Sequence, residues 1–156
     1  METATIQPQR SFLEKAITRQ GTVLAVHHWK PAGICEIEIQ LPRVNMASWT
    51  TPPHIKTRVA PFTYRDYTPA KWNSKYGTCS IFIDTDHEGA GSNWAQHLNA
   101  NDPFFYVGVD GTRQKVRDGD HLVFLGDQSA MGHFSGLQQL AAPGNWISGV
   151  LHITNP

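Results

Sequence analysis

An arginine, a tyrosine and a threonine lie close together in the most basic part of the chain, as Arg65, Tyr67 and Thr68. Between His54 and Tyr76 there are five lysines or arginines and one acidic residue. Alternate side chains of an extended strand point the same way, so Arg65 and Tyr67 would share one face. A guanidinium binds phosphate in a forked geometry, and a tyrosine ring stacks on flat aromatic groups. The pair is a candidate site for a ligand that carries both groups. The alternative is an ordinary surface pair of strand residues.

A glycine turn follows the next alternating segment, residues 79–84. The turn reads Gly89-Ala90-Gly91-Ser92, and Asn93-Trp94-Ala95 continue into a predicted short helix. The first turn of a helix offers free backbone N–H groups and the positive end of the helix dipole, which suits a phosphate. The alternative is that Ser92 or Asn93 only caps the helix.

A third stretch follows the apolar run 122–125, where Asp127 and Ser129 come directly after a predicted parallel strand. Ligands of open α/β sheets bind at the carboxyl ends of such strands. A nucleophile elbow requires Gly-x-Ser-x-Gly, and that pattern fails at Asp127 and Met131.

Metal chemistry is not predicted. Residues 84–89 mimic the start of a calcium loop, but Ala95 stands where the bidentate glutamate would be needed. The eight histidines lack ligand spacing, and Cys35 and Cys79 form neither a metal motif nor a disulfide framework. Reduced, buried thiols in a cytoplasmic protein are the expectation.

The length and composition limit the number of domains and the kinds of partner. A chain of 156 residues makes one domain, or one domain plus a fragment, and 40% hydrophobic residues can build a core. Zero formal net charge does not suggest nucleic acid or an anionic membrane as a partner. The first twenty residues lack the apolar segment of a signal peptide, and no stretch is long enough to span a bilayer.

The elements that must position these residues are mostly short strands. A helix is predicted to begin at a capping box of Ser11 and Glu14, to run through Ile17 and to close near Gly21. Residues 71–77 are predicted to be a turn region. Strands are predicted at 22–29, 34–41, 54–60, 62–68, 76–84 and 104–109, and a second helix at 92–99. Strands at this spacing indicate a small antiparallel barrel.

The pattern changes after Gly119. The run 122–125 is predicted to be a strand buried on both faces, 131–140 has helical spacing, and 147–153 is a second apolar strand. One βαβ unit cannot bury both faces of two apolar strands. We therefore expect an incomplete α/β domain, a truncated or short natural chain, and self-association through the exposed edge.

Taken together, the three stretches resemble the siderophore-interacting proteins, which are FAD-dependent ferric-siderophore reductases of the ferredoxin-reductase-like superfamily. The family motifs are Arg-x-Tyr-Thr, Gly-Pro-Ala-Ser-x-Trp-Ala and Gly-Asp-x-Ser/Thr-Ala-Leu-Pro, and the resemblance covers residues 11–154. This chain departs from them at Ala90-Gly91 and at Met131-Gly132.

The resemblance implies a mainly β fold, with a Greek-key FAD-binding barrel over 21–118, an incomplete nicotinamide-binding domain over 119–156, and a tail and helix over 1–20. It implies that Arg65 binds the FAD pyrophosphate, that Tyr67 packs on the isoalloxazine and that Thr68 acts catalytically near the reactive nitrogen. Gly89, Ala90, Gly91 and Ser92 would also bind the pyrophosphate. Asp127 and Ser129 would face the nicotinamide, and Trp94 is either a core residue or a neighbour of the adenosine.

The activity implied is electron transfer from NADPH or NADH through FAD to ferric iron in a siderophore. Lys56, Arg58, Lys71 and Lys75 are candidates for a basic substrate rim, although a solvated face is the simpler reading. The alternative function is a non-catalytic flavin-binding or interaction module on the same barrel.

Overall fold

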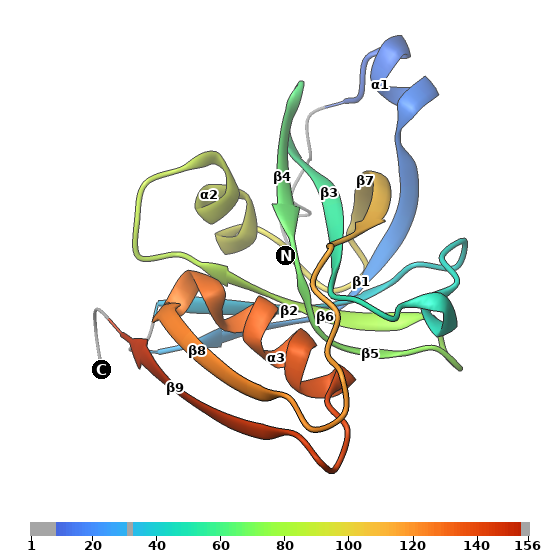
Figure 1. Cartoon of the computed structure of the whole chain (residues 1–156). Helices are drawn as coiled ribbons and strands as arrows, with labels where there is room; N and C mark the ends of the chain where they lie inside the picture. Colours follow the sequence, from blue (N-terminus) through green and yellow to red (C-terminus); the bar gives the residue numbers. More distant parts are fainter. Residues whose placement is uncertain (1–8, 31–32, 154–156) are drawn as a thin grey trace.

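The computed structural model describes residues 9–30 and 33–153, which form a large antiparallel sheet and a small parallel sheet (Figure 1). The strands of the large sheet are β1 (Arg19–Trp29), β2 (Ile34–Gln40), β3 (Pro53–Ala60), β4 (Thr63–Tyr67), β5 (Pro69–Asn73), β6 (Thr78–Asp84) and β7 (Pro103–Gly111). The small sheet has β8 (His121–Asp127) and β9 (Trp146–His152). The α-helices are α1 (Phe12–Ile17), α2 (Ala90–Gln96) and α3 (Met131–Leu140), and η1 (Met46–Ser48) and η2 (Gln128–Ala130) are single 3₁₀ turns.

The strand order of the large sheet, β4-β3-β7-β1-β2-β6-β5, makes it curl. Strands β4 and β5 are the two edges of the sheet, yet only Thr68 separates them in sequence. A one-residue link cannot bridge a flat seven-stranded sheet, because each strand adds about 4.8 Å of width. The sheet therefore bends back on itself, which confirms the predicted antiparallel barrel.

The barrel interior is filled by alternate residues of the strands. On β2 and just after it, Cys35, Ile37, Ile39 and Leu41 are fully buried, as the alternating pattern predicts. They pack with the inward residues of the other strands and with Ala95 and Leu98 from the α2 region. This core supports the strand face on which α2 lies.

Some predicted boundaries were wrong. Residues Pro69–Asn73, predicted partly as turn, form the edge strand β5, where a proline that opens the strand is tolerated. Helix α1 has the predicted capping box and runs through Ile17 as predicted, but Gly21 does not close it, because Gly21 lies inside β1. A side chain at Gly21 would collide with the Gln40 carbonyl oxygen, so close approach of two strands explains this glycine.

The parallel unit β8–α3–β9 packs on the barrel through α3, which lies between the two sheets (Figure 1). Gln139 holds α3 to β5 with two bonds: Nε2 donates to the Trp72 carbonyl (2.9 Å), and Oε1 accepts from the Trp72 N–H (2.9 Å). A Cβ at Gly132 would lie 2.6 Å from the Thr68 carbonyl oxygen, so only glycine permits this approach. The division at residues 118 and 119 into two domains remains a proposal.

Strand β8 was predicted to be buried on both faces, and this was wrong. Val123 is 60% exposed and Leu125 73% exposed. Helix α3 covers only the opposite face of the parallel pair, where the Phe124 and Phe134 rings stack 4.6 Å apart.

Candidate functional site

Strand β4 positions Arg65 and Tyr67 beside the first turn of α2. The strand is held by pairing with β3, with Arg65 opposite Thr57 and Tyr67 opposite Ile55. A Cβ built on Gly91 would collide with the Tyr67 phenol oxygen and would lie 3.8 Å from Cγ of Arg65. Both side chains therefore reach the same point on α2, as the alternation of the strand predicts.

One pocket of about 470 Å³ joins the three predicted stretches. It contains Arg65 and Tyr67 from β4, the whole turn Gly89, Ala90, Gly91 and Ser92, and Ser129 from η2. Its volume lies within the range of about 300–1,000 Å³ typical of small-molecule sites. Residues from separate parts of the sequence thus meet at one hollow between the barrel and the parallel unit.

The first turn of α2 is not capped by Ser92 or Asn93, which was the alternative interpretation of this turn. The N-cap is Gly89, no side chain caps the first turn, and the helix begins at Ala90. Ser92 is buried inside the helix, and its hydroxyl donates to the Asp84 carbonyl oxygen (2.8 Å). Ser92 therefore fastens the helix to the end of β6, and neither Ser92 nor Asn93 is the cap.

His87 is a pocket residue that the sequence reasoning missed. Its Nδ1 lies 3.1 Å from Oγ of Ser92. The single hydroxyl hydrogen of Ser92 is used on Asp84, so Nδ1 must be the donor in this contact. The position of His87 in the turn between β6 and α2 could have identified it from the sequence.

Tyr67 and Trp94 form an aromatic pair beside the pocket. Their ring planes are 13° apart with centroids 6.3 Å apart, and Trp94 also contacts Phe104 of the core. The core interpretation of Trp94 thus has support in its packing. Burial raises the pKa of Tyr67 to about 12, although the charge of Arg65 lowers it. The phenol remains protonated at neutral pH and can donate a hydrogen bond.

The pocket has one strong cation and several acidic groups. Arg65 is exposed, and its Nη1 donates to the Tyr64 carbonyl oxygen (2.8 Å). Asp66, Asp84 and Glu88 also line the pocket, and Asp66 is paired with Lys56 (3.0 Å). Arg65 belongs to none of the ion pairs found among residues 9–30 and 33–153. Binding of an anion here would depend strongly on that one guanidinium.

The other predicted site residues lie elsewhere. Thr68 does not line the pocket; its Cγ2 would be 3.6 Å from a Cβ at Gly136 of α3. Asp127 caps η2, because its Oδ1 accepts from the Ser129 N–H (2.9 Å) and the Ser129 hydroxyl (2.6 Å). These bonds hold the pKa of Asp127 below its usual range. Of the pair, only Ser129 reaches the pocket.

Gly91 allows the phenol oxygen of Tyr67 to approach the first turn of α2 more closely than any side chain would permit, and this explains one departure from the family motif. The pocket residues fit a flavin nucleotide in their chemistry. The guanidinium next to a phenol ring provides the groups that a pyrophosphate and an aromatic ring require.

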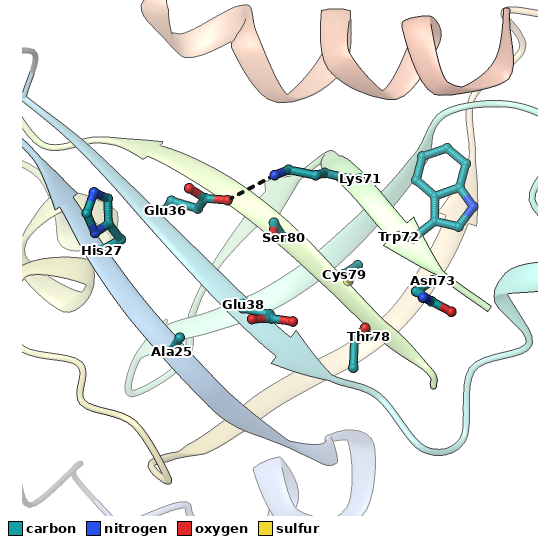
Figure 2. A pocket seen from close by; sticks show the side chains of 10 residues that line it. All are labelled: Ala25, His27, Glu36, Glu38, Lys71, Trp72, Asn73, Thr78, Cys79 and Ser80. Atoms are coloured by element: carbon teal, nitrogen blue, oxygen red, sulfur yellow. Dashed lines mark ion pairs between the residues drawn. The ribbon is translucent and has the colours of Figure 1, made fainter. Parts of the chain in front are cut away.

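A second pocket of about 470 Å³ lies on the outer surface of β1, β2, β6 and β5 (Figure 2). Glu36, Glu38, His27 and Lys71 line it, and Lys71 is 3.7 Å from Glu36. It contains none of the predicted cofactor residues. Two carboxylates against one ammonium make it a poor site for an anionic substrate.

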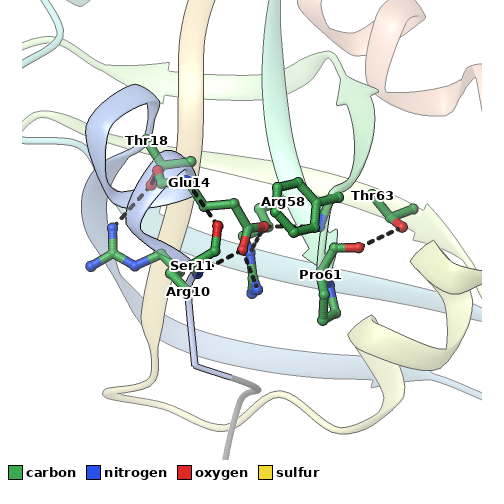
Figure 3. A network of polar contacts seen from close by, with 8 residues as sticks. Arg10, Ser11, Glu14, Thr18, Arg58, Pro61 and Thr63 are labelled. Carbon is green, nitrogen blue, oxygen red and sulfur yellow. Dashed lines mark hydrogen bonds and ion pairs between the residues drawn. The ribbon is translucent and has the colours of Figure 1, made fainter.

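Arg58, a candidate for a basic rim, is instead buried at 3% exposure (Figure 3). Its Nε donates to Oε1 of Glu14 (2.7 Å) and its Nη2 to Oε2 (3.3 Å). Glu14 also accepts from the backbone N–H groups of Phe62 (2.9 Å) and Ser11 (3.0 Å). The rim interpretation of Arg58 is therefore wrong, because its charge holds α1 on the barrel.

No group of three or more histidine, cysteine, aspartate or glutamate side chains in 9–30 and 33–153 could hold a metal ion. Within the same residues, no helix is long and apolar enough to cross a membrane.

The strand order, the short α2 beside β4 and the parallel unit that follows β7 define the class: a ferredoxin-reductase-like barrel with an α/β unit. No protein-family model matches the sequence, and no curated protein sequence matches it. Solved structures share its fold.

Three similar structures illustrate this fold. The siderophore-interacting protein of Acinetobacter baumannii is 14% identical, with a TM-score of 0.65 over 89% of this chain and 69% of that one. The siderophore-interacting protein of Aeromonas hydrophila is 15% identical, with a TM-score of 0.64 over 88% and 60%. A ferredoxin NADP⁺ reductase of Neisseria gonorrhoeae, solved with FAD and NADP, is 16% identical, with a TM-score of 0.65 over 90% and 59%. The chain therefore spans 59–69% of the length of these three solved chains.

Proposed function

We propose that the protein is a flavin-binding oxidoreductase of the ferric-siderophore reductase type. The observation that supports this most is the single pocket that contains Arg65, Tyr67 and the turn from Gly89 to Ser92. The fold shared with siderophore-interacting proteins and with a reductase solved with FAD supports the same cofactor.

In this proposal Arg65 and the turn at Gly91 hold the pyrophosphate of FAD, and Tyr67 packs beside the flavin ring. Trp94 packs beside Tyr67, with its ring nearly parallel to the Tyr67 ring. Asp127 orients Ser129 through its two hydrogen bonds, and Ser129, which lines the pocket, would face the nicotinamide. The catalytic assignment of Thr68 requires that α3 leave its hydroxyl accessible.

The electron donor in the proposal is NADPH or NADH, and the acceptor is siderophore-bound Fe(III). Bound FAD would supply hydride-accepting and one-electron-donating chemistry, so one nicotinamide would reduce two ferric ions. Oxygen ligands hold ferrous iron less tightly than ferric iron, which releases the metal. A cytoplasmic location fits the nicotinamide donor and the reduced thiols.

A non-catalytic flavin-binding module is the second candidate, and the position of Thr68 favours it. Thr68 lies against Gly136 of α3 and does not line the pocket, so the residue proposed as catalytic would not reach a ligand bound there. This candidate predicts FAD binding without nicotinamide oxidation.

The first experiment measures FAD binding by the quenching of flavin fluorescence, for the protein and for Arg65→Ala. The matched control is Lys75→Ala, an exposed cation outside the pocket. We expect Arg65→Ala to weaken binding at least tenfold, because a charge-assisted contact contributes about 1.5–3 kcal/mol. The control should bind as the unmodified protein does.

The second experiment separates the two candidates. NADPH or NADH is added under anaerobic conditions with a ferric trihydroxamate and a ferrous chelator. Two ferrous ions per nicotinamide oxidised would support the reductase. FAD binding with no oxidation would support the module, and an unchanged affinity in Arg65→Ala would contradict both site assignments.

A further inference from the structure

The outer-face pocket is the hollow on β1, β2, β6 and β5 that Figure 2 shows, and it shares no residue with the candidate flavin pocket. Strand pairing decides which side chains meet there. Ala25 of β1 lies opposite Glu38 of β2. Ser80 of β6 lies between Glu38 and Lys71 of β5. Because Ala25 and Ser80 are small, the long side chains of their neighbours enclose an open space.

Ser80 is the most buried polar residue of this pocket. It is only 9% exposed, yet its hydroxyl forms no hydrogen bond with any residue in 9–30 and 33–153. The side chain points outward into the pocket, because Cys79 and Ile81 on either side of it belong to the barrel core and alternate residues of a strand face opposite ways. A buried hydroxyl without a partner costs free energy unless a group in the pocket bonds to it. A ligand with a polar group would supply that bond.

The charged groups of the pocket favour a cation. The carboxylates of Glu36 and Glu38 lie there with one ammonium, of Lys71, and the imidazole of His27. Glu36 is already used, because its Oε2 accepts from Nε1 of Trp29 (3.2 Å) and its Oε1 lies 3.7 Å from Nζ of Lys71. The side chain of Glu38 has no hydrogen bond or ion pair with the described residues. The pocket thus holds an unpaired carboxylate beside an unpaired hydroxyl.

An organic ammonium suits these groups better than a metal ion does. Within the described residues, no three metal-binding side chains lie close enough together to hold a metal. An ammonium donates up to three hydrogen bonds, and carboxylate and hydroxyl oxygens accept them. Glu36 and Glu38 are two residues apart on one face of β2, which separates their Cα atoms by roughly 6.6 Å. A short carbon chain of that length joins the two ammonium groups of a small diamine.

We propose that the outer-face pocket binds a short aliphatic diamine, with one ammonium between Glu38 and Ser80 and the other beside Glu36. The volume of about 470 Å³ lies in the range of small-molecule sites. Lys71 competes with the second ammonium, but its side chain is 69% exposed and its contact with Glu36 is long, so little stability is lost when a ligand replaces it.

The test is a titration of nitrogen-15-labelled protein with 1,4-diaminobutane at pH 7, followed by the backbone amide signals in NMR spectra. We expect saturable changes on β2 and β6 around Glu38 and Ser80, and none at Arg65 or Tyr67. The dissociation constant should be about 1 mM or lower, because so small a ligand makes few contacts. n-Butylamine, which has one ammonium, should bind about threefold more weakly or worse. Tetramethylammonium has the charge but donates no hydrogen bond, so it should give no saturable change.

Substitutions should change the affinity in both directions. Glu38→Gln keeps the shape and removes the charge, so it should weaken binding about fivefold or more. Ser80→Ala should weaken it about threefold. Lys71→Met removes the competing ammonium and should strengthen binding about threefold. The control is Asp110→Asn, at an exposed acidic residue of β7 outside the pocket, which should bind as the unmodified protein does. The same spectra verify that each variant folds.

Four outcomes would overturn the proposal. The first is no saturable change on β2 and β6 up to about 20 mM diamine. The second is equal affinity for tetramethylammonium, which would indicate attraction to surface charge only. The third is weaker binding by Lys71→Met, and the fourth is an unchanged affinity in both Glu38→Gln and Ser80→Ala. None of these readouts depends on flavin, so the diamine site and the flavin site can fail separately.

Discussion

The buried pair of Glu14 and Arg58 allows a quantitative prediction for Glu14→Gln. The two side chains are 1% and 2% exposed, and the Glu14 carboxylate accepts four hydrogen bonds. Glutamine keeps the shape and one acceptor oxygen but removes the charge. Arg58 would then lose the carboxylate that balances its charge inside the barrel wall.

Two approaches give a similar value for the stability that Glu14→Gln would lose. Removing one member of a buried ion pair costs about 3–5 kcal/mol. The hydrogen bond from Arg58 is the main reason that the pKa of Glu14 falls from 4.5 to about 2, against the opposing effect of burial. At about 1.4 kcal/mol per pH unit, that difference corresponds to about 3 kcal/mol. We expect Glu14→Gln to lower the free energy of unfolding by about 3 kcal/mol at pH 7. This is the lower end of the range, because detachment of the short helix α1 would relieve part of the cost.

The pH dependence follows from the direction of the pKa change. The folded carboxyl titrates at about 2 and the unfolded one near 4.5, so the unfolded chain takes up the proton first as the pH falls. The contribution of Glu14 is therefore present above about pH 4.5 and is lost between about pH 4.5 and pH 2. The stability difference between the protein and Glu14→Gln should shrink through that window.

Urea unfolding at several pH values measures this difference. The control is Lys56→Met, which breaks the exposed Lys56–Asp66 pair, with side chains 47% and 50% exposed. That change should cost less than about 1 kcal/mol. A fall in the free energy of unfolding of less than about 1 kcal/mol for Glu14→Gln at pH 7 would refute the role assigned to this ion pair. A fall that stays the same size from pH 7 to pH 3 would also refute it.

Two further predictions concern packing. Gly136→Ala would gain up to about 1 kcal/mol of helix propensity, but its Cβ would lie 2.8 Å from the Pro69 carbonyl oxygen. Overpacking of about 1–3 kcal/mol should outweigh the gain, so the midpoint of thermal unfolding should fall. Gly108→Ala, whose Cβ would meet no atom within 4 Å, should not show that loss, and an unchanged midpoint for both would contradict the assigned contact. Burial raises the pKa of the Cys35 thiol to about 11 and also raises that of Cys79. Both thiols should react with a disulfide reagent only after unfolding, and fast reaction of the folded protein would show that they are accessible.

The sequence by itself determined the features that depend on local physical chemistry. The alternation from Cys35 to Leu41 gave a half-buried strand because side chains of a strand point to alternate faces. The capping box of Ser11 and Glu14 started α1 because a hydroxyl and a carboxylate satisfy free N–H groups within four residues. The predicted βαβ unit followed from the same periodic patterns.

The candidate site was predictable in part. Arg65, Tyr67 and the glycine turn were identified by residue type and order, and the structure brings them into one pocket. Thr68 and Asp127 were placed there by resemblance, but their side chains are used against α3 and in the η2 cap. Which side chain reaches a pocket depends on neighbours that no local pattern specifies.

Only the tertiary structure decided the long-range partners. Arg58 lies 44 residues from Glu14, so nothing in the basic stretch distinguishes it from the solvated lysines beside it. Gly132 and Gly136 are required by the carbonyl groups of Thr68 and Pro69, where β4 leads into the edge strand β5, and the sequence pattern did not indicate that α3 would pack there. Sequence patterns show which face of an element is apolar. Which other element packs on that face depends on the three-dimensional path of the chain. Among the described residues, no element packs on the outer face of β8 and β9.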